Sequence, residues 1–226
     1  MFDAVWFYFP RIAFRRYAKL ALREFAPDRA ARIWSETLEQ QKSLALRRPR
    51  YSLGTNFLLR YMEWDCALYR AIRAEGIAED RARAVIEKIN WDAFGPMIRL
   101  SFQCSRLRSS HLLTRVMWIL DAMFAFIFTS PFQRKKYAHL DEIAFDVTSC
   151  PLAKYFKDQG APELTNAAAC RLDYQMASVW SMELVRAQTI AEGHSFCDFR
   201  FRARLAGQSA VVKSDLPKQS QHLDAS

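Results

Sequence analysis

The stretch Ile143–Gly160, IAFDVTSCPLAKYFKDQG, decides the fold class of this chain. Its first residues, Ile143–Ser149, alternate apolar side chains with small or polar ones, which predicts a half-buried strand. Pro151 suits the first position of a helix and Gly160 suits its end, so a short helix over 151–159 is expected next. A sheet therefore begins in this part of the chain.

The residues before this stretch are predicted to be helical. Apolar side chains recur there at three- and four-residue steps, and breakers such as Pro27 and Gly76 separate the runs. The first two helices are expected to pack as a hairpin. The expected helices are Pro10–Phe25, Asp28–Leu46, Thr55–Glu75, Ala78–Trp91, which ends before Gly95-Pro96, and two more that are separated near Ser109-Ser110 and ended by Ser130-Pro131.

The residues after the deciding stretch combine one longer helix with two extended runs. Asn166–Trp180 is expected to form the helix, with Thr165 or Asn166 as its cap. Leu184–Ile190 and Phe196–Arg204 are the extended runs, and the short link AEGHS between them predicts an antiparallel hairpin.

This order of elements predicts an α+β class, in which a helical N-terminal part is followed by a small antiparallel sheet with packed helices. The expected domains are a helical region over 1–138 and an α+β region over 139–206, which are compatible with one shared core. Periodicity vanishes over 207–226, which predicts a loose tail.

Composition restricts the function classes. The 226 residues are 51% apolar, and 33 Lys and Arg against 24 Asp and Glu give a formal net charge of +9. The excess is spread along the chain, and no zinc-finger, homeodomain or aromatic RNA-binding signature is present, so nucleic acid is not an expected partner. Arginine binds carboxylates through two points, and a basic chain therefore also suits a small substrate that carries a carboxylate.

The N-terminus and the five cysteines predict a reduced, cytoplasmic setting. Asp3 precedes a short apolar run and basic residues follow it, which reverses the charge order of a signal peptide. Free thiols are then expected. The most apolar run, Val116–Phe128, has 13 residues and contains Asp121, whereas a bilayer needs about 20. A buried helix is therefore favoured over a membrane element.

Three cysteines of the C-terminal part lie at positions with a chemical argument. Cys150 directly precedes a predicted helix, whose unpaired amides and dipole are expected to lower the pKa of its thiol. Cys170 and Asp173 are three residues apart on a predicted helix and share a face. Cys197 follows the predicted hairpin turn. A thiol beside a carboxylate suits nucleophilic attack on an electrophilic carbon.

Two plainer interpretations compete with this chemistry. Free cysteine packs as a small hydrophobe, so each of the three thiols is also compatible with a core position. Thiolates with a carboxylate or imidazole also hold zinc, but the separations of 19 and 26 residues lack the usual close pairs, and no metal is expected. Serine-hydrolase, phosphate-loop, dinucleotide and zinc-protease motifs are absent from the sequence.

Three segments carry a family resemblance. They are CPLAKYFKDQGAPELT from Cys150, the pair Cys170-x-x-Asp173, and TIAEGHSFCDFRF from Thr189. In this order they resemble the C-terminal half of the L-2-amino-thiazoline-4-carboxylic acid hydrolase family, over roughly residues 140–202. The matching positions are Cys150, Cys170, Asp173, Gly193, Cys197, Asp198 and Phe199.

The resemblance implies a hydrolase that opens a cyclic amidine, an isothiourea or a related C–N bond substrate and needs no cofactor. In the family's reaction, water adds to 2-aminothiazoline-4-carboxylate at the carbon between nitrogen and sulfur, which yields N-carbamoyl-cysteine. We expect Cys170 or Cys197 to attack this carbon while Asp173 binds the amidine nitrogens and relays protons. Cys150 is expected to lie close by as a second thiol.

The substrate carboxylate needs cationic partners. Arg186 and Arg200 are the expected ones, because adjacent strands can place their guanidinium groups side by side. His194 and Asp198, which neighbour Cys197 in the predicted hairpin, complete the expected substrate-binding set.

Two further functions remain open. The Gly-x-x-x-Cys hairpin also resembles ligand-binding domains of the vinyl-reductase type, which would imply capture of an apolar small molecule without turnover. The abundant Phe, Trp and Met of the helical half suit such a pocket or a plain core. The aromatic residues 6–9, followed by arginines, fit an interfacial membrane anchor, although a helix docked on the core or on a second copy in a homo-oligomer is favoured.

Overall fold

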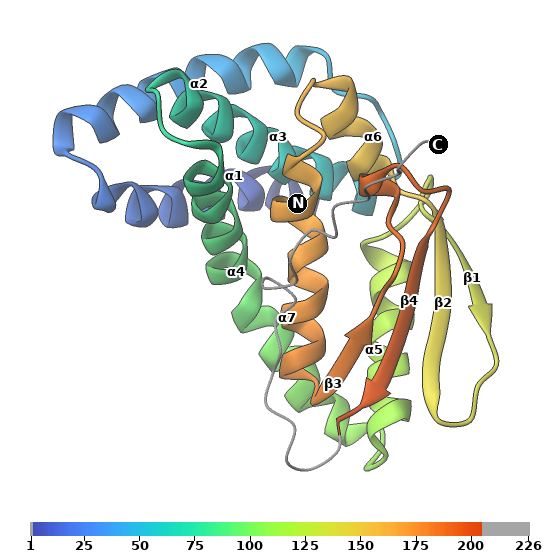
Figure 1. The fold of residues 1–226 in the computed structure, drawn as a ribbon. Helices are drawn as coiled ribbons and strands as arrows, with labels where there is room; N and C mark the ends of the chain where they lie inside the picture. The colour runs from blue at the N-terminus through green and yellow to red at the C-terminus, as the bar shows by residue number, and fades with distance from the viewer. Residues whose placement is uncertain (1, 205–226) are drawn as a thin grey trace, which may run out of the picture.

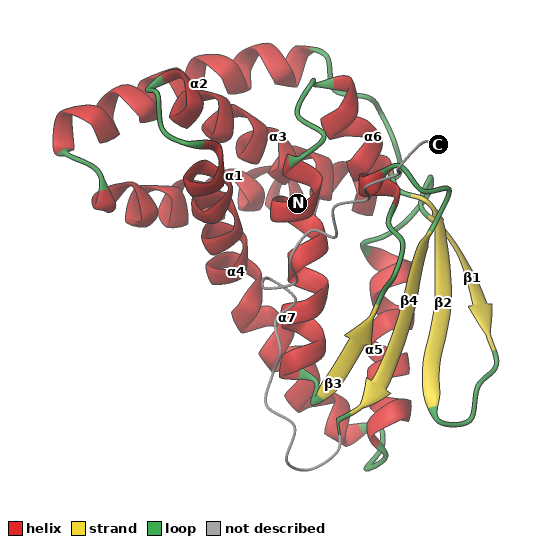
Figure 2. Ribbon diagram, viewed as in Figure 1, coloured by secondary structure: helices red, strands yellow, loops and turns green. Residues whose placement is uncertain are grey.

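Helices precede the sheet along the chain, as the sequence predicts (Figure 1, Figure 2). The structure is a computed structural model that describes residues 2–204, with side chains described from residue 11 onward. The predicted tail over 207–226 lies outside the described residues. The helical part consists of α1 (Phe2–Ala21), α2 (Pro27–Leu46), α3 (Leu53–Ala74), α4 (Glu79–Cys104) and α5 (Leu112–Phe126). The C-terminal part consists of β1 (Gln133–Tyr137), β2 (Glu142–Ser149), α6 (Pro151–Asp158), a π-helical turn (Asn166–Cys170), α7 (Arg171–Val179), β3 (Met182–Val185) and β4 (Cys197–Ala203).

The strands form one antiparallel sheet in the order β1-β2-β4-β3. Its register pairs Val147 of β2 with Cys197 of β4, and Phe145 with Phe199. The rings of the latter pair stack with their centroids 4.9 Å apart. The α+β class is confirmed, and β3 pairs with β4 in the predicted antiparallel direction. The predicted strand Leu184–Ile190 is wrong beyond Val185, where β3 ends, so the connection to β4 is longer than the predicted link AEGHS.

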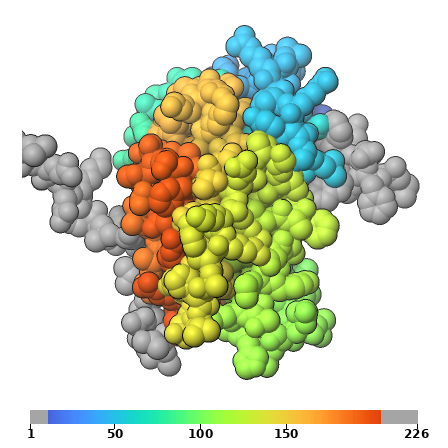
Figure 3. All heavy atoms as spheres, turned by 90° about the vertical axis from the view of Figure 1, so that its right-hand side faces the viewer, coloured from blue at the N-terminus to red at the C-terminus, as the bar shows by residue number. Residues whose placement is uncertain are grey.

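Two apolar clusters meet near the start of α6. One cluster lies between the sheet and helices α5 and α7, where Ile119 and Met176 pack with Phe201. The other joins α1–α4 with α6 and the π-helical turn. Phe132 and Cys150 contact both clusters, so Cys150 lies at their junction. Figure 3 views the molecule from the sheet side, with the strands in yellow to orange-red beside the yellow-green α5.

The predicted hairpin of the first two helices is wrong. Helices α1 and α2 each pack against α3 and diverge from one another (Figure 1). The reason is that α3 is apolar on several faces: Leu59, Leu68 and Ile72 are all fully buried within it. A helix that is buried all round recruits a neighbour on each side.

The predicted end of a helix before Gly95-Pro96 is also wrong. Helix α4 continues through Pro96 to Cys104. A proline inside a helix costs one backbone hydrogen bond, which is about 3 kcal/mol. Phe94 packs into the first cluster and Phe102 into the second, so burial on both sides of Pro96 holds the helix continuous and offsets this loss.

Strand β1 was not predicted, because its sequence QRKKY has no apolar alternation. It lies at the edge of the sheet beside β2, where charged side chains can face water and discourage pairing with another chain. Arg134 of this strand donates to Asp121 of α5 (2.5 Å) and lies over the ring of Phe124 (4.1 Å to the centroid). These contacts to α5 fix the strand in place.

No helix within residues 2–204 combines the length and hydrophobicity that crossing a bilayer requires. The aromatic side chains of residues 6–9, on which the predicted interfacial anchor depends, lie outside the described side chains. The anchor stays a prediction.

Gly54 allows α3 to approach the end of α5. A Cβ at this position would lie 2.6 Å from the carbonyl oxygen of Ile127 and 2.9 Å from its Cα, both of them backbone atoms. We therefore expect Gly54→Ala to destabilise the protein by about 1–3 kcal/mol, because the two helices must move apart. Denaturant unfolding measures this loss. Gly95→Ala is the control, since its Cβ would meet only side-chain atoms, at 3.3 Å or more. Equal stability of wild type and Gly54→Ala would contradict the close approach.

Candidate functional site

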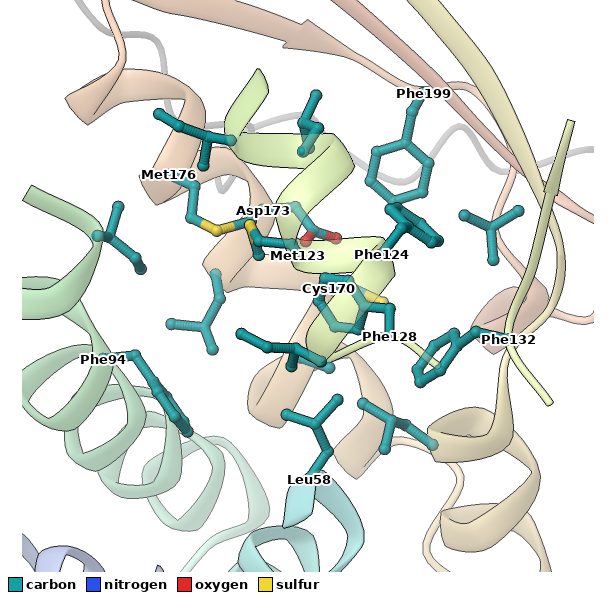
Figure 4. A pocket seen from close by; sticks show the side chains of 18 of the residues that line it. Leu58, Phe94, Met123, Phe124, Phe128, Phe132, Cys170, Asp173, Met176 and Phe199 are labelled. Atoms are coloured by element: carbon teal, nitrogen blue, oxygen red, sulfur yellow. The ribbon is translucent and has the colours of Figure 1, made fainter. Parts of the chain in front are cut away.

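A cavity of about 480 Å³ lies at the junction of the two clusters. Its walls come from α3, α4, α5, the π-helical turn, α7 and the sheet, and most of its lining side chains are aromatic or aliphatic (Figure 4). This volume is within the range of small-molecule sites, roughly 300–1,000 Å³.

The three thiols predicted to carry chemistry line this one cavity. Cys150 enters from the end of β2, Cys170 from the π-helical turn and Cys197 from the start of β4. Asp173 of α7 lines it as well, and its carboxylate points into the cavity beside Cys170 (Figure 4). The groups are close enough to influence one another's ionisation. Arg186, which follows β3, is the fifth polar residue of this group. We call these five residues the polar wall.

Arg186 is the most constrained member of the polar wall. Its Nη1 donates to Oδ2 of Asp173 (2.8 Å), and its Nη2 donates to the carbonyl oxygen of Cys170 (3.2 Å). Its guanidinium lies between the rings of Tyr174 and Phe199, with 4.9 Å to each centroid. The side chain is 2% exposed. Such a buried guanidinium is held in one orientation, with its charge directed at the Asp173 carboxylate.

The ion pair sets the charge state of the polar wall. Burial raises the pKa of the Asp173 carboxyl, and the adjacent Arg186 opposes this rise. Burial alone would lower the pKa of Arg186, but the Asp173 carboxylate raises it above the usual value of arginine. A carboxylate with a raised pKa is a better proton acceptor than one in water.

The expected lowering of the Cys150 pKa is wrong. The amides of Leu152 and Ala153 at the start of α6 do favour its thiolate, but burial outweighs them and raises the pKa of Cys150 to about 12. Burial likewise raises the pKa of Cys170, against the charge of Arg186. Desolvation disfavours the charged thiolate, and at Cys170 the nearby guanidinium does not offset it. Burial therefore favours the protonated form of the Cys150 and Cys170 thiols.

Cys197 has an additional partner. Burial raises the pKa of its thiol, and the amide of Ile190, which donates to its Sγ over 3.2 Å, opposes this rise.

Among the described residues no three His, Cys, Asp or Glu side chains are arranged to hold a metal ion.

Three of the predicted substrate-binding residues lie away from the cavity. The Asp198 carboxylate accepts the backbone amides of Ala187 (3.0 Å) and Gln188 (2.6 Å), so it shapes the connection between β3 and β4. His194 is exposed in that connection. Arg200 donates to Asp146 (3.0 Å).

Arg186 and Arg200 are not side by side, contrary to expectation. The register pairs Arg200 with Val185, so Arg186 points to the opposite face of the sheet. The face of Arg200 carries charged groups, whereas the face of Arg186 carries the cavity. Alternation along a strand separates consecutive side chains in this way.

The π-helical turn places Cys170 and was missed by the sequence analysis, which expected a regular helix capped by Thr165 or Asn166. No side chain caps this segment. Instead the buried amide of Asn90 donates to the carbonyl oxygen of Ala168 (2.9 Å) and to Asp65 (3.0 Å). Turns of this kind leave backbone carbonyls that need such a partner and are frequent at functional sites. The available signal in the sequence was the presence of two polar residues, Asp65 and Asn90, among apolar residues of helices α3 and α4, and neither belongs to a motif.

The comparisons with known proteins identify a family for the C-terminal half of the chain. Residues 113–201 match the family model described as L-2-amino-thiazoline-4-carboxylic acid hydrolase, which confirms the resemblance predicted from the sequence. The matched segment contains the whole polar wall. No curated protein matches the chain. The chain is similar at 9% identity to a solved Fe(II) unliganded H-NOX protein mutant from K. algicida, covering 86% of this chain and 96% of that one with a TM-score of 0.37. A TM-score this low does not establish a shared fold.

Removing Arg186 would leave Asp173 as an unpaired buried carboxylate. We expect Arg186→Met to destabilise the protein by about 3–5 kcal/mol at neutral pH. The deficit should shrink as pH falls, because loss of Arg186 removes the charge that lowers the pKa of the buried Asp173 carboxyl, so the variant protonates Asp173, and loses the unpaired charge, at a higher pH than the wild type does. Denaturant unfolding at several pH values measures both effects.

Arg202→Met is the control for this prediction. The Arg202 side chain of the Arg202–Glu142 ion pair is exposed, so this pair should contribute about 1 kcal/mol or less to the free energy of unfolding. The double variant Asp173→Asn, Arg186→Met should recover part of the loss. A loss in Arg186→Met no larger than in Arg202→Met would argue against a buried ion pair.

The raised thiol pKa values predict slow alkylation. At pH 7.5 we expect iodoacetamide to modify the exposed Cys104 first. The Cys150 thiol should react about three orders of magnitude more slowly than an ordinary thiol, because its pKa of about 12 leaves little thiolate. Peptide mass spectrometry measures each rate, and urea-unfolded protein is the control in which all five cysteines react alike. Rapid labelling of Cys150 in the folded protein would contradict the raised pKa.

Proposed function

We propose that the cavity is the active site of a small-molecule hydrolase that opens a cyclic amidine or isothiourea ring of the 2-aminothiazoline-4-carboxylate type. The observation that carries this proposal is the convergence of Cys150, Cys170 and Cys197 with one carboxylate and one guanidinium on a single cavity, whose lining also includes the exposed Cys104. The family match over the same residues names this reaction class.

The ion pair of the polar wall suits a zwitterionic substrate. Asp173 and Arg186 carry opposite charges 2.8 Å apart, and an amidinium with a carboxylate presents the complementary arrangement. The Asp173 carboxylate would bind the amidine nitrogens, and Arg186 would bind the substrate carboxylate. Both charges are fixed before the substrate enters, so little ordering is required on binding.

The bond changes then proceed in two steps. A cysteine sulfur adds to the ring carbon between nitrogen and sulfur, and its proton passes to Asp173. The bond from that carbon to the ring sulfur breaks, and Asp173 returns the proton to the departing sulfur as a thiol. Water next adds to the same carbon, the enzyme sulfur leaves and recovers a proton, and the carbon becomes the carbonyl of the carbamoyl product.

Cys197 is the thiol that this proposal favours as nucleophile over Cys170. Its Sγ accepts the Ile190 amide, and the Arg186 charge lies nearby, so two groups stabilise its thiolate. The positive charge of a bound amidinium would stabilise this thiolate further.

A second candidate function is binding of an apolar small molecule without turnover, as in domains of the vinyl-reductase type. The specific observation that favours it is the lining of the cavity, which is apolar outside the polar wall apart from a few small polar side chains. Protonated thiols would suit this function equally well.

Alanine variants of the thiols distinguish these functions. With 2-aminothiazoline-4-carboxylate as substrate, the thiol released from the ring measures turnover. We expect Cys197→Ala to lower kcat by about 10⁴-fold or more, because the covalent step is lost. Asp173→Asn should lower kcat by about 10²–10⁴-fold, whereas Cys150→Ala should have a smaller effect.

Cys66→Ala is the matched control, because it removes a buried thiol of α3 that does not line the cavity. Thermal unfolding of each variant separates loss of chemistry from loss of fold. Unchanged kcat in the Cys150, Cys170 and Cys197 variants would exclude covalent thiol catalysis. Absence of turnover in the wild type, together with a co-purified apolar ligand in native mass spectrometry, would favour the binding function.

A further inference from the structure

The rest of the cavity lining, outside the polar wall, is mainly apolar. Figure 4 shows aromatic, aliphatic and thioether side chains of this part of the lining around Asp173 and Cys170. We call it the apolar chamber, and its lining includes Leu58, Phe94, Met123, Phe124, Phe128 and Phe132. None of these six side chains has a hydrogen-bonding N–H or O–H group, so this part of the wall favours an apolar substituent.

The volume of the cavity is larger than an unsubstituted aminothiazoline carboxylate requires. At roughly 30 Å³ per heavy atom, the share of a water molecule in the liquid, an aminothiazoline carboxylate would occupy only about half of the cavity. The cavity holds about 480 Å³. Apolar walls hold water poorly, so the remaining space favours an apolar ligand group.

The rim of the cavity is apolar as well. Met97, Trp118 and Phe126 line the cavity and are also 46%, 45% and 73% exposed. Exposed large apolar side chains that continue into a cavity mark a route for an apolar group. The rim and the chamber therefore both favour an apolar group of the ligand.

From these observations we infer that the substrate of this protein is an amphipathic cyclic amidine, with a zwitterionic ring at the polar wall and an alkyl or aryl substituent in the apolar chamber. The inference rests on the proposed function and names its substrate class. The substituent would add binding free energy without touching the reacting atoms, and that energy helps to hold the ring against Asp173 and Arg186.

A homologous substrate series tests the inference. The probes are 2-aminothiazoline-4-carboxylates with hydrogen, methyl, butyl or hexyl on the ring carbon next to sulfur. Each methylene that enters the chamber should raise kcat/KM about fourfold, and we expect at least a tenfold rise from methyl to hexyl. The n-alkanols butanol, hexanol and octanol, which cannot react, measure chamber binding separately by displacement of a fluorescent apolar dye.

Matched variants locate the effect. Ala122 lines the cavity and Ala125 is exposed on the same helix α5. Ala122→Phe should fill part of the chamber and flatten the dependence of kcat/KM on chain length, while Ala125→Phe should leave it unchanged. If Ala122→Phe does not fold, Met123→Gln, which introduces a polar amide without adding volume, serves in its place.

The outcomes separate the inference from the proposed function. A kcat/KM that rises with chain length, with a dependence that only Ala122→Phe flattens, supports both the amphipathic substrate and the hydrolase function. Equal kcat/KM for the unsubstituted and hexyl substrates overturns the amphipathic substrate while the hydrolase remains. If no member of the series is turned over but alkanol affinity rises with chain length, the proposed function is overturned and the binding alternative takes its place. If the protein shows neither turnover of the series nor alkanol binding that depends on chain length, both the inference and the proposed function are overturned.

Discussion

The buried contact between Arg186 and Asp173 is the constraint on which the candidate site depends. A guanidinium with 2% exposure is costly to bury unless its hydrogen bonds and charge are matched, and here a carboxylate, the Cys170 carbonyl and two aromatic rings match them. The contact joins the segment after β3 to α7 and to the π-helical turn. It thereby fixes the sheet against the π-helical turn and α7, which carry Cys170 and Asp173 of the polar wall, and it defines the polar end of the cavity.

Burial acts on this site in two opposite ways. It concentrates reactive groups in a space with little water, where electrostatic interactions are strong. It also raises the pKa values of Cys150, Cys170 and Cys197 and so favours their neutral forms. A cationic substrate would reverse this condition by placing positive charge beside the sulfurs. The same desolvation therefore explains why the cavity suits an apolar ligand and why activation of a thiol would depend on the substrate that enters.

Much of the fold is readable from local patterns. The boundaries of α3, α6 and β2 agree with the sequence analysis, because each has clear periodicity and a proline or positive-φ glycine at an end. The errors concern elements whose form depends on neighbours. Helix α4 passes through Pro96 because both of its halves are buried, and β1 is a strand because β2 lies beside it. Neither cause is visible in the local residues.

The sequence by itself determined the α+β class, the order of most elements, the resemblance of the C-terminal half to a hydrolase family, and the identity of the three thiols and Asp173 as the residues to watch. Only the tertiary structure decided that they share one cavity, that Arg186 faces it while Arg200 does not, and that burial raises the thiol pKa values. The physical reason is the separation along the chain over which each effect acts. Periodicity and capping act over a few residues, whereas desolvation and ion pairing depend on segments that meet only when the chain has folded.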